Sequence, residues 1–426
     1  MKQIYIMIIL LLCIACSEFK INVTPVASTT ETAILSKEEA CEIALSAITD
    51  FYPEKVTVKS DGSSPQISVS SVISIDQNFT KSGNHLSDPL MYAVNFDNNN
   101  GFALISTNRN TSSLLAITKN GYYDGISTGN QNLDLYIDEL TYNLKNIETN
   151  SFIDVPIIND SYRTVTRRDT TSIPSMSTTV WHQWEPFNWY CSYPYNSDIP
   201  TGCGPIAIAQ AMAIFQYPSS IELTYNHAGT DCINLSWSNM INHKNPHSDC
   251  IYCKQNASLL AEIYKQYDAY YNPTTGGSST YLIDAPGCLE AFGYSSNFVS
   301  YYDLSSITQS LSNSYPVIIR GEQADGSGHA WLIDGYKYYF TETKTYRSVS
   351  GQIEELYSTE QIKEWYLSFN YGHNGTNNGY FICRKEISAE GENVVGGSVT
   401  SVPISIFDSR FHNIDNKLVT NIHPEI

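Results

Sequence analysis

Residues 201–215 read TGCGPIAIAQAMAIF, and Pro218 follows shortly after them. The alanine-rich part is a good helix former, and Pro218 predicts its end because proline interrupts a helix. Pro205 is tolerated only in a first helical turn, which places Cys203 at, or one residue outside, the N-terminus of a buried helix. The N–H groups and the helix dipole at such an end favour thiolate over thiol. The stretch therefore predicts either a cysteine nucleophile lying open between two glycines or a buried cysteine that caps a core helix.

A cysteine nucleophile needs a base, and His329 has the most suitable setting of the nine histidines. It follows the glycine-rich residues 326–328 and begins a strand-like run that ends in a turn. A third group usually orients the base, and Asn370, at the end of another strand-like stretch, could hold the imidazole through its side-chain amide. Gln183 could stabilise an oxyanion together with the backbone N–H of Cys203. Taken singly, the histidine reads equally as a loop residue and the asparagine as a turn residue.

The first part of the chain predicts a small α+β unit over residues 30–150, without an obvious catalytic cluster. Ser36 and Glu39 have the spacing of a capping box, and apolar residues at helical spacing continue to about residue 52. Three strand-like runs follow at 91–96, 101–107 and 114–118, of which the first two flank a turn-forming DNNNG segment. A second amphipathic helix carries Leu133, Ile137, Leu140, Leu144 and Ile147.

Residues 160–180 change character, because they are rich in Ser and Thr and show no apolar period. We expect a linker here, and linkers of this kind are preferred sites of proteolytic nicking. From Trp181 onward the sequence is denser in aromatic residues, Gly and Cys, which predicts a second domain. A chain of 426 residues is too long for one ordinary domain, in agreement with this division.

The composition is that of a globular, acidic protein. Hydrophobic residues make up 42% and charged residues 16% of the chain, which excludes a disordered protein. The net charge of −19 and the isoelectric point of about 4.8 oppose binding to a phosphate backbone, so we expect no nucleic-acid partner. We also expect no cofactor.

The N-terminus predicts export. Lys2 precedes an apolar run over residues 4–15 that is too short to span a bilayer stably. Ala15 before Cys16 resembles a bacterial lipoprotein cleavage site, although Cys13 departs from the usual pattern. We expect a membrane attachment through a lipid at Cys16, on the outer membrane of a bacterial cell envelope, or secretion after processing. Plain secretion after cleavage nearby is the alternative.

Four stretches in this order and spacing resemble the streptopain family of bacterial cysteine peptidases, which belongs to the papain-like clan. They lie at 181–188, 201–218, 329–335 and 370–381, and their order and spacing agree across about 200 residues of the chain. Residues 92–106 resemble the characteristic hairpin of this family's inhibitory prodomain. The resemblance implies an α+β protein, in which a papain-like cysteine peptidase domain follows a small α+β inhibitory prodomain.

The resemblance also implies the site and the activity. It assigns four catalytic residues, namely the nucleophile Cys203, the general base His329, the oxyanion donor Gln183, and Asn370 beside the base. Substrate contacts are expected from Gly328, Ala330, Tyr371 and Gly277. The chain is then the zymogen of a secreted cysteine endopeptidase that cleaves protein or peptide substrates through a thioester, and its own prodomain is an intramolecular partner.

The corresponding division of the chain has four parts. We expect a lipoprotein signal peptide over 1–16, a propeptide domain over 17–160, a linker with the activation cleavage over 161–180, and the catalytic domain over 181–426. Cleavage in the linker would separate the catalytic domain from an anchor at Cys16.

The sequence departs from the family at the loop after Asn370. Two tryptophans that shield the catalytic histidine in the family are replaced by Tyr371 and His373, and the next glycine is replaced by Asn374. His373 could compete with His329 as the base. These changes keep two other functions open, a non-catalytic surface lipoprotein that binds through the peptidase fold and an amidase that acts on cell-wall peptides.

A second group of residues has metal-ligand types at compact spacing, namely His243, His247, Cys250 and Cys253. Zinc sites use such residues, although a single CxxC is a weak signal. Oxidising compartments favour disulfides, so we expect a solvent-facing loop or a disulfide here, and no metal.

Overall fold

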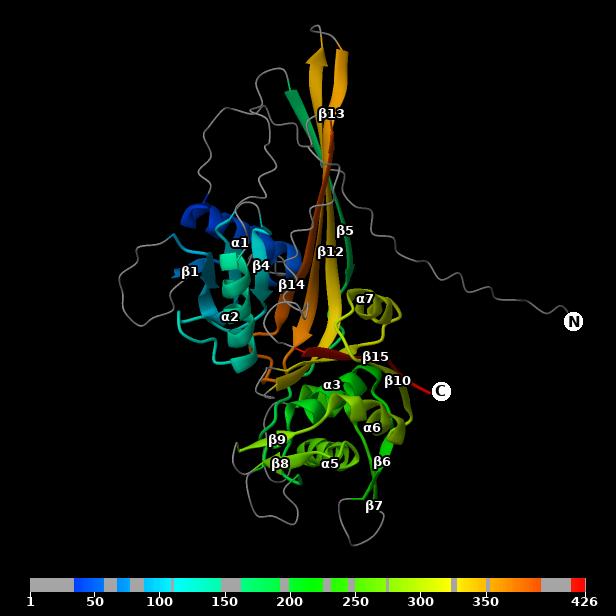
Figure 1. The fold of residues 1–426 in the computed structure, drawn as a ribbon. Coiled ribbons are helices and arrows are strands. Elements are labelled where there is room, and N and C mark those ends of the chain that lie inside the picture. Colours follow the sequence, from blue (N-terminus) through cyan, green and yellow to red (C-terminus); the bar gives the residue numbers. More distant parts are fainter. Residues whose placement is uncertain are drawn as a thin grey trace, which may run out of the picture.

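The computed structural model describes residues 34–56, 67–76, 88–108, 111–146, 162–191, 199–224, 231–243, 250–272, 276–322, 328–349, 353–391 and 415–425. One antiparallel sheet of eleven strands runs through the whole molecule (Figure 1). In spatial order its strands are β1 (Val69–Ile75), β2 (Met91–Phe96), β3 (Phe102–Ser106), β4 (Leu114–Thr118), β14 (Gly379–Gly391), β13 (Ile353–Asn370), β12 (Gly328–Val349), β11 (Val317–Glu322), β15 (Asp415–Pro424) and β10 (Tyr294–Val299), and β5 (Tyr162–Ile173) pairs with β12.

The N-terminal unit, residues 34–146, combines β1 to β4 with α1 (Lys37–Phe51) and α2 (Gln131–Asn146). The capping box predicted for α1 is confirmed: the Ser36 side chain accepts the N–H of Glu39, whose carboxylate accepts the N–H of Ser36 at 2.8 Å. The predicted strands β2, β3 and β4 are confirmed to within a residue or so. Short 3-10 turns lie at η1 (Pro53–Lys55) and η2 (Asp97–Asn99).

The remaining helices gather at the other end of the sheet, below it in Figure 1 except for α7. α3 (Cys203–Phe215) is almost entirely buried, which explains why its sequence is apolar on all sides. The other elements of this end are α4 (Trp237–Asn242), α5 (Ile251–Gln266), η3 (Leu282–Asp284), α6 (Ala285–Ala291), α7 (Leu304–Ser312), the hairpin of β6 (Ser220–Leu223) and β7 (Asp231–Asn234), and the hairpin of β8 (Tyr270–Asn272) and β9 (Gly277–Ser279). The predicted α+β class is confirmed.

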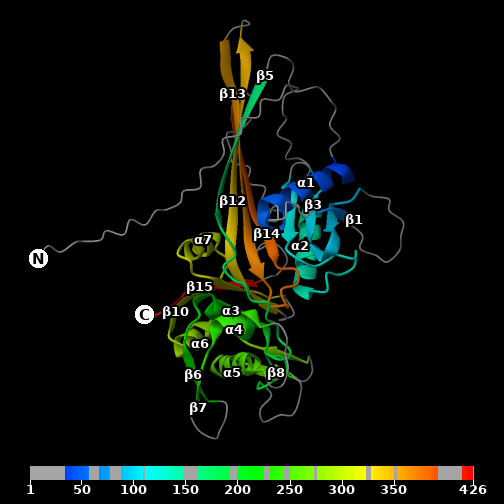
Figure 2. The same cartoon turned by 180° about the vertical axis from the view of Figure 1, so that it is seen from behind.

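The prediction of an irregular linker over 161–180 is wrong for residues 162–173, which form β5. β5 pairs with β12 along its full length, and β12 continues with β13 into a long hairpin beyond the helices (Figures 1 and 2). β5 shows no apolar period because no continuous core lies against it. Its threonines suit a strand, and Arg168 lies 4.0 Å from the ring centre of Tyr339. Cleavage within 161–180 stays a prediction.

The N-terminal unit and the rest of the chain share one sheet, and one of the two hydrophobic clusters of the described residues spans both parts, whereas the other lies around α3. β4 pairs with β14, where Gly379 lies opposite Thr118. At the end of α1, the ring centres of Phe51 and Tyr380 are 5.1 Å apart. Nζ of the largely buried Lys337 forms an ion pair with Oδ1 of Asp50 at 2.6 Å. The two parts are therefore held together by backbone hydrogen bonds, aromatic packing and charge.

No helix among the described residues is both long and apolar enough to cross a bilayer. The predicted signal peptide over 1–16, with Cys16, lies outside the described residues.

Gly379 is expected to limit the stability of the junction between β4 and β14. A Cβ at this position would lie 2.3 Å from the carbonyl oxygen of Ile117, so Gly379→Ala should force the strands apart and cost about 1–3 kcal/mol in the free energy of unfolding. Gly287→Ala is the matched control, because no atom lies within 4 Å of its Cβ position and alanine favours the helix by about 0.5–1 kcal/mol. Urea unfolding of the full chain measures both, and equal stability of the two variants would contradict this role of Gly379.

Candidate active site

Cys203 is the first residue of α3, as the sequence predicted, and it is half-buried. Glycines flank it because neighbouring atoms leave no room for side chains. Gly202 has a φ of 86°, and a Cβ on Gly204 would lie 2.5 Å from Thr280 Oγ1 and 2.8 Å from a ring carbon of Tyr267. The two glycines therefore fit the N-terminus of α3 tightly against the segment around β9.

The start of β12 brings His329 to Cys203. β12 pairs with β11 so that Gly321 lies opposite His329 and Arg320 opposite Ala330. The N–H of Ala330 donates a hydrogen bond to Cys203 Sγ at 3.3 Å, and the imidazole of His329 also hydrogen-bonds the thiol. The predicted pair of nucleophile and base thus lies together in the structure.

The surroundings of Cys203 stabilise its thiolate. Burial raises the pKa of the Cys203 thiol, but four contributions outweigh it: the charge of His329, the hydrogen bond from its ring, the N–H of Ala330 and the charge of Arg320. Together they lower the pKa to about 7 from the ordinary 9.0. A substantial share of Cys203 is therefore thiolate near neutral pH.

A backbone carbonyl orients the His329 ring. Nε2 of His329 lies 3.2 Å from the carbonyl oxygen of Tyr371, and because a carbonyl can only accept, Nε2 carries the hydrogen. Nδ1 is then the nitrogen left to face the sulfur. The Trp331 ring lies nearly parallel to the imidazole at 6.1 Å, and the Tyr371 ring lies 5.8 Å from Trp331.

The structure corrects the predicted contact between Asn370 and the imidazole. The buried amide of Asn370 accepts from Gln210 Nε2 at 2.9 Å and from the N–H of Gly372 at 3.1 Å, and it donates to the carbonyl of Thr179 at 3.0 Å and to Ser177 Oγ at 3.2 Å. Both ends of the amide are thus engaged by groups other than His329. Asn370 lies beside the site and joins α3, the loop after β13, and the segment before Trp181.

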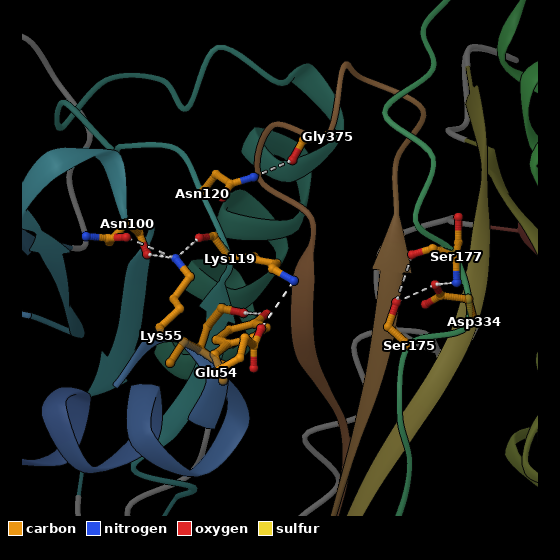
Figure 3. A network of polar contacts seen from close by, with 11 residues as sticks. Glu54, Lys55, Asn100, Lys119, Asn120, Ser175, Ser177, Asp334 and Gly375 are labelled. Carbon is orange, nitrogen blue, oxygen red and sulfur yellow. Dashed lines mark hydrogen bonds and ion pairs between the residues drawn. The ribbon is translucent and has the colours of Figure 1, made fainter. Parts of the chain in front are cut away.

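Gln210 and Asp334 are positioning residues that the sequence interpretation missed. Asp334, on β12, is 1% exposed and accepts from Ser175 Oγ at 2.6 Å and from the N–H of Ser177 at 2.8 Å (Figure 3). Burial raises the pKa of Asp334. The sequence did contain one indication for Gln210: it lies between two alanines in an apolar helix. A buried amide in such a helix needs a hydrogen-bond partner.

Gln183 is half-buried in the segment that runs past the start of α3. Its carbonyl oxygen accepts the N–H of Thr201 at 3.0 Å, and the carbonyl of Trp181 accepts the N–H of Asn374 at 3.2 Å. This segment therefore lies between the approach to Cys203 and the loop after β13. The predicted oxyanion role of the Gln183 side chain stays a prediction.

The residues expected to contact substrate have different surroundings. Gly328 and Ala330 flank His329 on β12, and Gly277 begins β9, whose Ser278 donates to the carbonyl of Pro200 at 2.6 Å. The Tyr371 ring, by contrast, is 3% exposed and packs on Trp331, Phe369 and Phe381. Its side chain belongs to an apolar cluster, and its carbonyl serves the histidine.

His373 and Asn374 are exposed on the loop after β13. Burial, and then the charge of His373, lower the pKa of His182, so these two histidines lie near each other. The idea that His373 competes as the base stays a hypothesis.

The N-terminal unit binds the loop that carries the Tyr371 carbonyl. Asn120 Nδ2 donates to the carbonyl of Gly375 at 3.1 Å (Figure 3), and the N–H of Lys119 donates to the carbonyl of Asn378 at 2.7 Å. Asn377 in turn donates to the carbonyl of Thr128 at 3.0 Å. The group that orients His329 is thus held in place partly by residues 119–128.

Among the described residues, no group of three or more His, Cys, Asp or Glu side chains that could hold a metal includes Cys203 or His329. The groups that the structure brings together at Cys203 are its thiol, the imidazole of His329 and the N–H of Ala330.

Comparisons with known proteins give two family matches and a likeness of fold. A family model described as the peptidase C10 family matches residues 181–381, and one described as a Spi protease inhibitor matches residues 32–144. A solved fragment of prointerpain A from Prevotella intermedia is 18% identical, covers 84% of this chain and 99% of its own, and superposes with a TM-score of 0.51, which shows the likeness of fold. Active interpain A from the same organism is 18% identical over 59% of this chain and 95% of its own, with a TM-score of 0.37. No curated protein matches the sequence.

The thiol of Cys203 is expected to react as an anion near neutral pH. Because its pKa is lowered to about 7, the rate of alkylation by iodoacetamide should rise through a transition near pH 7. His329→Gln removes the charge that contributes most to this lowering, so the transition should move to higher pH.

The Cys203→Ser variant is the control for this experiment, because it should lose the fast alkylation phase while its other cysteines still react slowly. Mass spectrometry of the alkylated peptides gives the rates. A transition near 9 in the unmodified chain would show that the thiolate is not stabilised.

Proposed function

The chain belongs to the peptidase C10 family and carries a Spi-type inhibitory prodomain at its N-terminus, and on this basis we propose that it is the zymogen of a cysteine endopeptidase with Cys203 as nucleophile and His329 as general base. The observation that carries the proposal is geometric: β12 brings His329 and the N–H of Ala330, which donates to Cys203 Sγ at 3.3 Å, to the N-terminus of α3. The lowered pKa of Cys203 agrees with a thiolate stabilised by this arrangement. A surface lipoprotein that only binds has no need of a stabilised thiolate, so this observation favours catalysis over the binding alternative.

The proposed reaction begins with attack of the Cys203 thiolate on the carbonyl carbon of a peptide bond. The S–C bond forms as the carbonyl electrons move to oxygen, and the backbone N–H of Cys203 and the amide of Gln183 stabilise the oxyanion. The C–N bond then breaks, and protonated His329 gives its Nδ1 proton to the leaving amine. A thioester remains on Cys203.

Hydrolysis of the thioester completes the proposed cycle. Neutral His329 takes a proton from water, and the resulting hydroxide adds to the thioester carbon. The second oxyanion collapses, the C–S bond breaks and the thiolate returns beside protonated His329. Because the Tyr371 carbonyl accepts from Nε2, the proton moves at Nδ1 in both half-reactions.

Control by the prodomain is proposed to act on the loop after β13. Residues 119–128 bind the backbone of residues 375–378, and β4 pairs with the start of β14. These contacts hold the loop whose Tyr371 carbonyl sets the ring of His329. Removal of the prodomain would release the loop, so that its position could respond to bound substrate.

We further propose that the precursor is exported and held by a lipid at Cys16, with cleavage between about residues 150 and 180. Support comes from the apolar run before Cys16 and from the polar composition around the expected cleavage region. The anchor would then remain on the prodomain, and the peptidase could leave the membrane.

His329 and His373 can be separated by mutation. His329→Ala should lower kcat on a casein-derived peptide by about 10²–10⁴ because the general base is lost. His373→Ala should stay within a few-fold of the unmodified enzyme, because the exposed His373 is assigned no proton transfer. Steady-state kinetics of matured protein measure both, and activity that survives in His329→Ala would transfer the role of base to another residue.

Maturation should depend on the chain's own nucleophile. Purified precursor incubated with a reductant should shorten to a fragment of roughly 250 of its 426 residues, whereas Cys203→Ala should stay full length. Gel electrophoresis with N-terminal sequencing identifies the product. Equal processing of the variant would mean that another protease in the preparation performs the cleavage.

A further inference from the structure

Three side chains with metal-ligand atoms come together at the junction of α4 and α5, and none of them belongs to the catalytic pair. The ligand atoms of His243, Cys250 and Cys253 all lie within 4.8 Å of one another, and both cysteines are buried. The cluster lies where the sequence favoured a loop or a disulfide. His247, the other ligand type in that stretch, lies outside the described residues.

Secondary structure fixes the positions of the three side chains. Cys250 is the N-cap of α5, and its Sγ accepts the N–H of Cys253 at 3.0 Å. His243 caps the end of α4. The two helices are joined by a bond from Asn256 Nδ2 to the carbonyl of Met240 at 3.2 Å. The end of α4 and the start of α5 therefore bring the three residues to one place.

The electrostatics of the α5 N-terminus suit an anionic sulfur. The first N–H groups of a helix and its dipole stabilise negative charge, and N–H donors to a ligating thiolate are a typical outer-shell feature of metal sites. Cys250 Sγ has such a donor in Cys253. Metal binding requires the same deprotonated state of cysteine.

A cavity of about 240 Å³ adjoins the cluster. It is lined by Val180, His182, Pro186, Phe187, His243, Cys253, Asn256 and Asn374. Asn256 is 2% exposed, and its Oδ1 has no hydrogen-bond partner among the described residues. A buried amide oxygen without a partner calls for one, and a water molecule bound to a metal in this cavity is a suitable donor.

We propose that His243, Cys250 and Cys253 bind a divalent transition metal of borderline softness, of which zinc is the best match, with the fourth coordination position facing this cavity. Two thiolates and one imidazole are ligands that zinc prefers. Tetrahedral zinc with these ligands places its donor atoms about 3.5–3.8 Å apart. Small side-chain rotations from the observed separations, all within 4.8 Å, therefore complete the geometry.

The metal would join parts of the chain that are distant in sequence. His182 and Phe187 belong to the segment that includes Gln183, and Asn374 belongs to the loop after β13. A ligand in the fourth position would thus occupy space between these two segments and the start of α5. The site does not use Cys203 or His329, and it would exist whether or not the chain is a peptidase.

The experiment uses the full chain, purified with a reductant, stripped with a chelator and titrated with Zn²⁺ and with Co²⁺. The unmodified chain should bind one metal per molecule. Its cobalt form should show the strong visible bands of tetrahedral cobalt and a near-ultraviolet charge-transfer band from thiolate. Cys250→Ser and Cys253→Ser should each weaken the charge-transfer band, and His243→Ala should lower the metal affinity by more than the roughly 10–100-fold that loss of an outer-shell partner costs.

Cys288→Ser is the matched control, because Cys288 is equally buried but lies in α6 outside the cluster. It should leave metal content and spectrum unchanged, and circular dichroism should show every variant to be folded. His182→Ala should also retain the metal. Loss of the metal in this variant would show that His182 is the fourth ligand and would overturn the assignment of an open fourth position.

Two results would overturn the proposal as a whole. In the first, the reduced and folded unmodified chain takes up no more Zn²⁺ and no more Co²⁺ than the Cys250→Ser variant does. The other is a disulfide between Cys250 and Cys253, detected by mass spectrometry after export, together with no metal uptake on reduction. Charge-transfer intensity that persists in both serine variants would place the bound metal at other cysteines and would equally refute the site.

Discussion

The meeting of the N-terminus of α3 with the first residues of β12 is the contact on which the candidate active site depends. The α3 end supplies Cys203, and β12 supplies both His329 and the N–H of Ala330 that donates to the sulfur. Pairing with β11 fixes the register of β12, so that Ala330 lies opposite Arg320. The charge of Arg320 also favours the thiolate. A shift of one residue in this ladder would turn His329 to the opposite face of the sheet, and nucleophile and base would separate.

A buried polar network supports this contact from the other side. Asn370 joins Gln210 of α3 to the segment around Thr179, and Asp334 of β12 binds the same segment at Ser177. Buried amides and carboxylates are costly when unsatisfied, so these residues specify one arrangement of helix, strand and loop. The position of the Tyr371 carbonyl follows from that arrangement. No residue type in the sequence predicts that this backbone carbonyl contacts His329.

What the sequence could predict was governed by local rules. The capping box at Ser36, the start of α3 at Cys203 and the strand that begins near His329 each depend on neighbouring residues, and each is found in the structure. β5 was missed because a polar strand is held by pairing with β12, far along the chain. The hydrogen-bond partners of Asn370 were missed for the same reason, since Gln210 is remote from it in sequence. The sequence showed that Cys250 and Cys253 are residue types that bind metals, but it could not distinguish a loop, a disulfide and a metal site. The structure adds that the ligand atom of His243 lies within 4.8 Å of both sulfur atoms.

The sheet shared through β4 and β14 has a consequence for the kinetics of activation. Cutting one peptide bond between the two parts leaves the pairing of Thr118 with Gly379, the packing of Phe51 and the ion pair of Asp50 intact. The immediate product is then a non-covalent complex, and its two halves have lost only the high effective concentration that the covalent link provided. Activity would appear at the rate of dissociation, and dilution would favour it. Until the edge of β14 finds another partner or is covered, its exposed backbone groups would also favour recapture of the released strand.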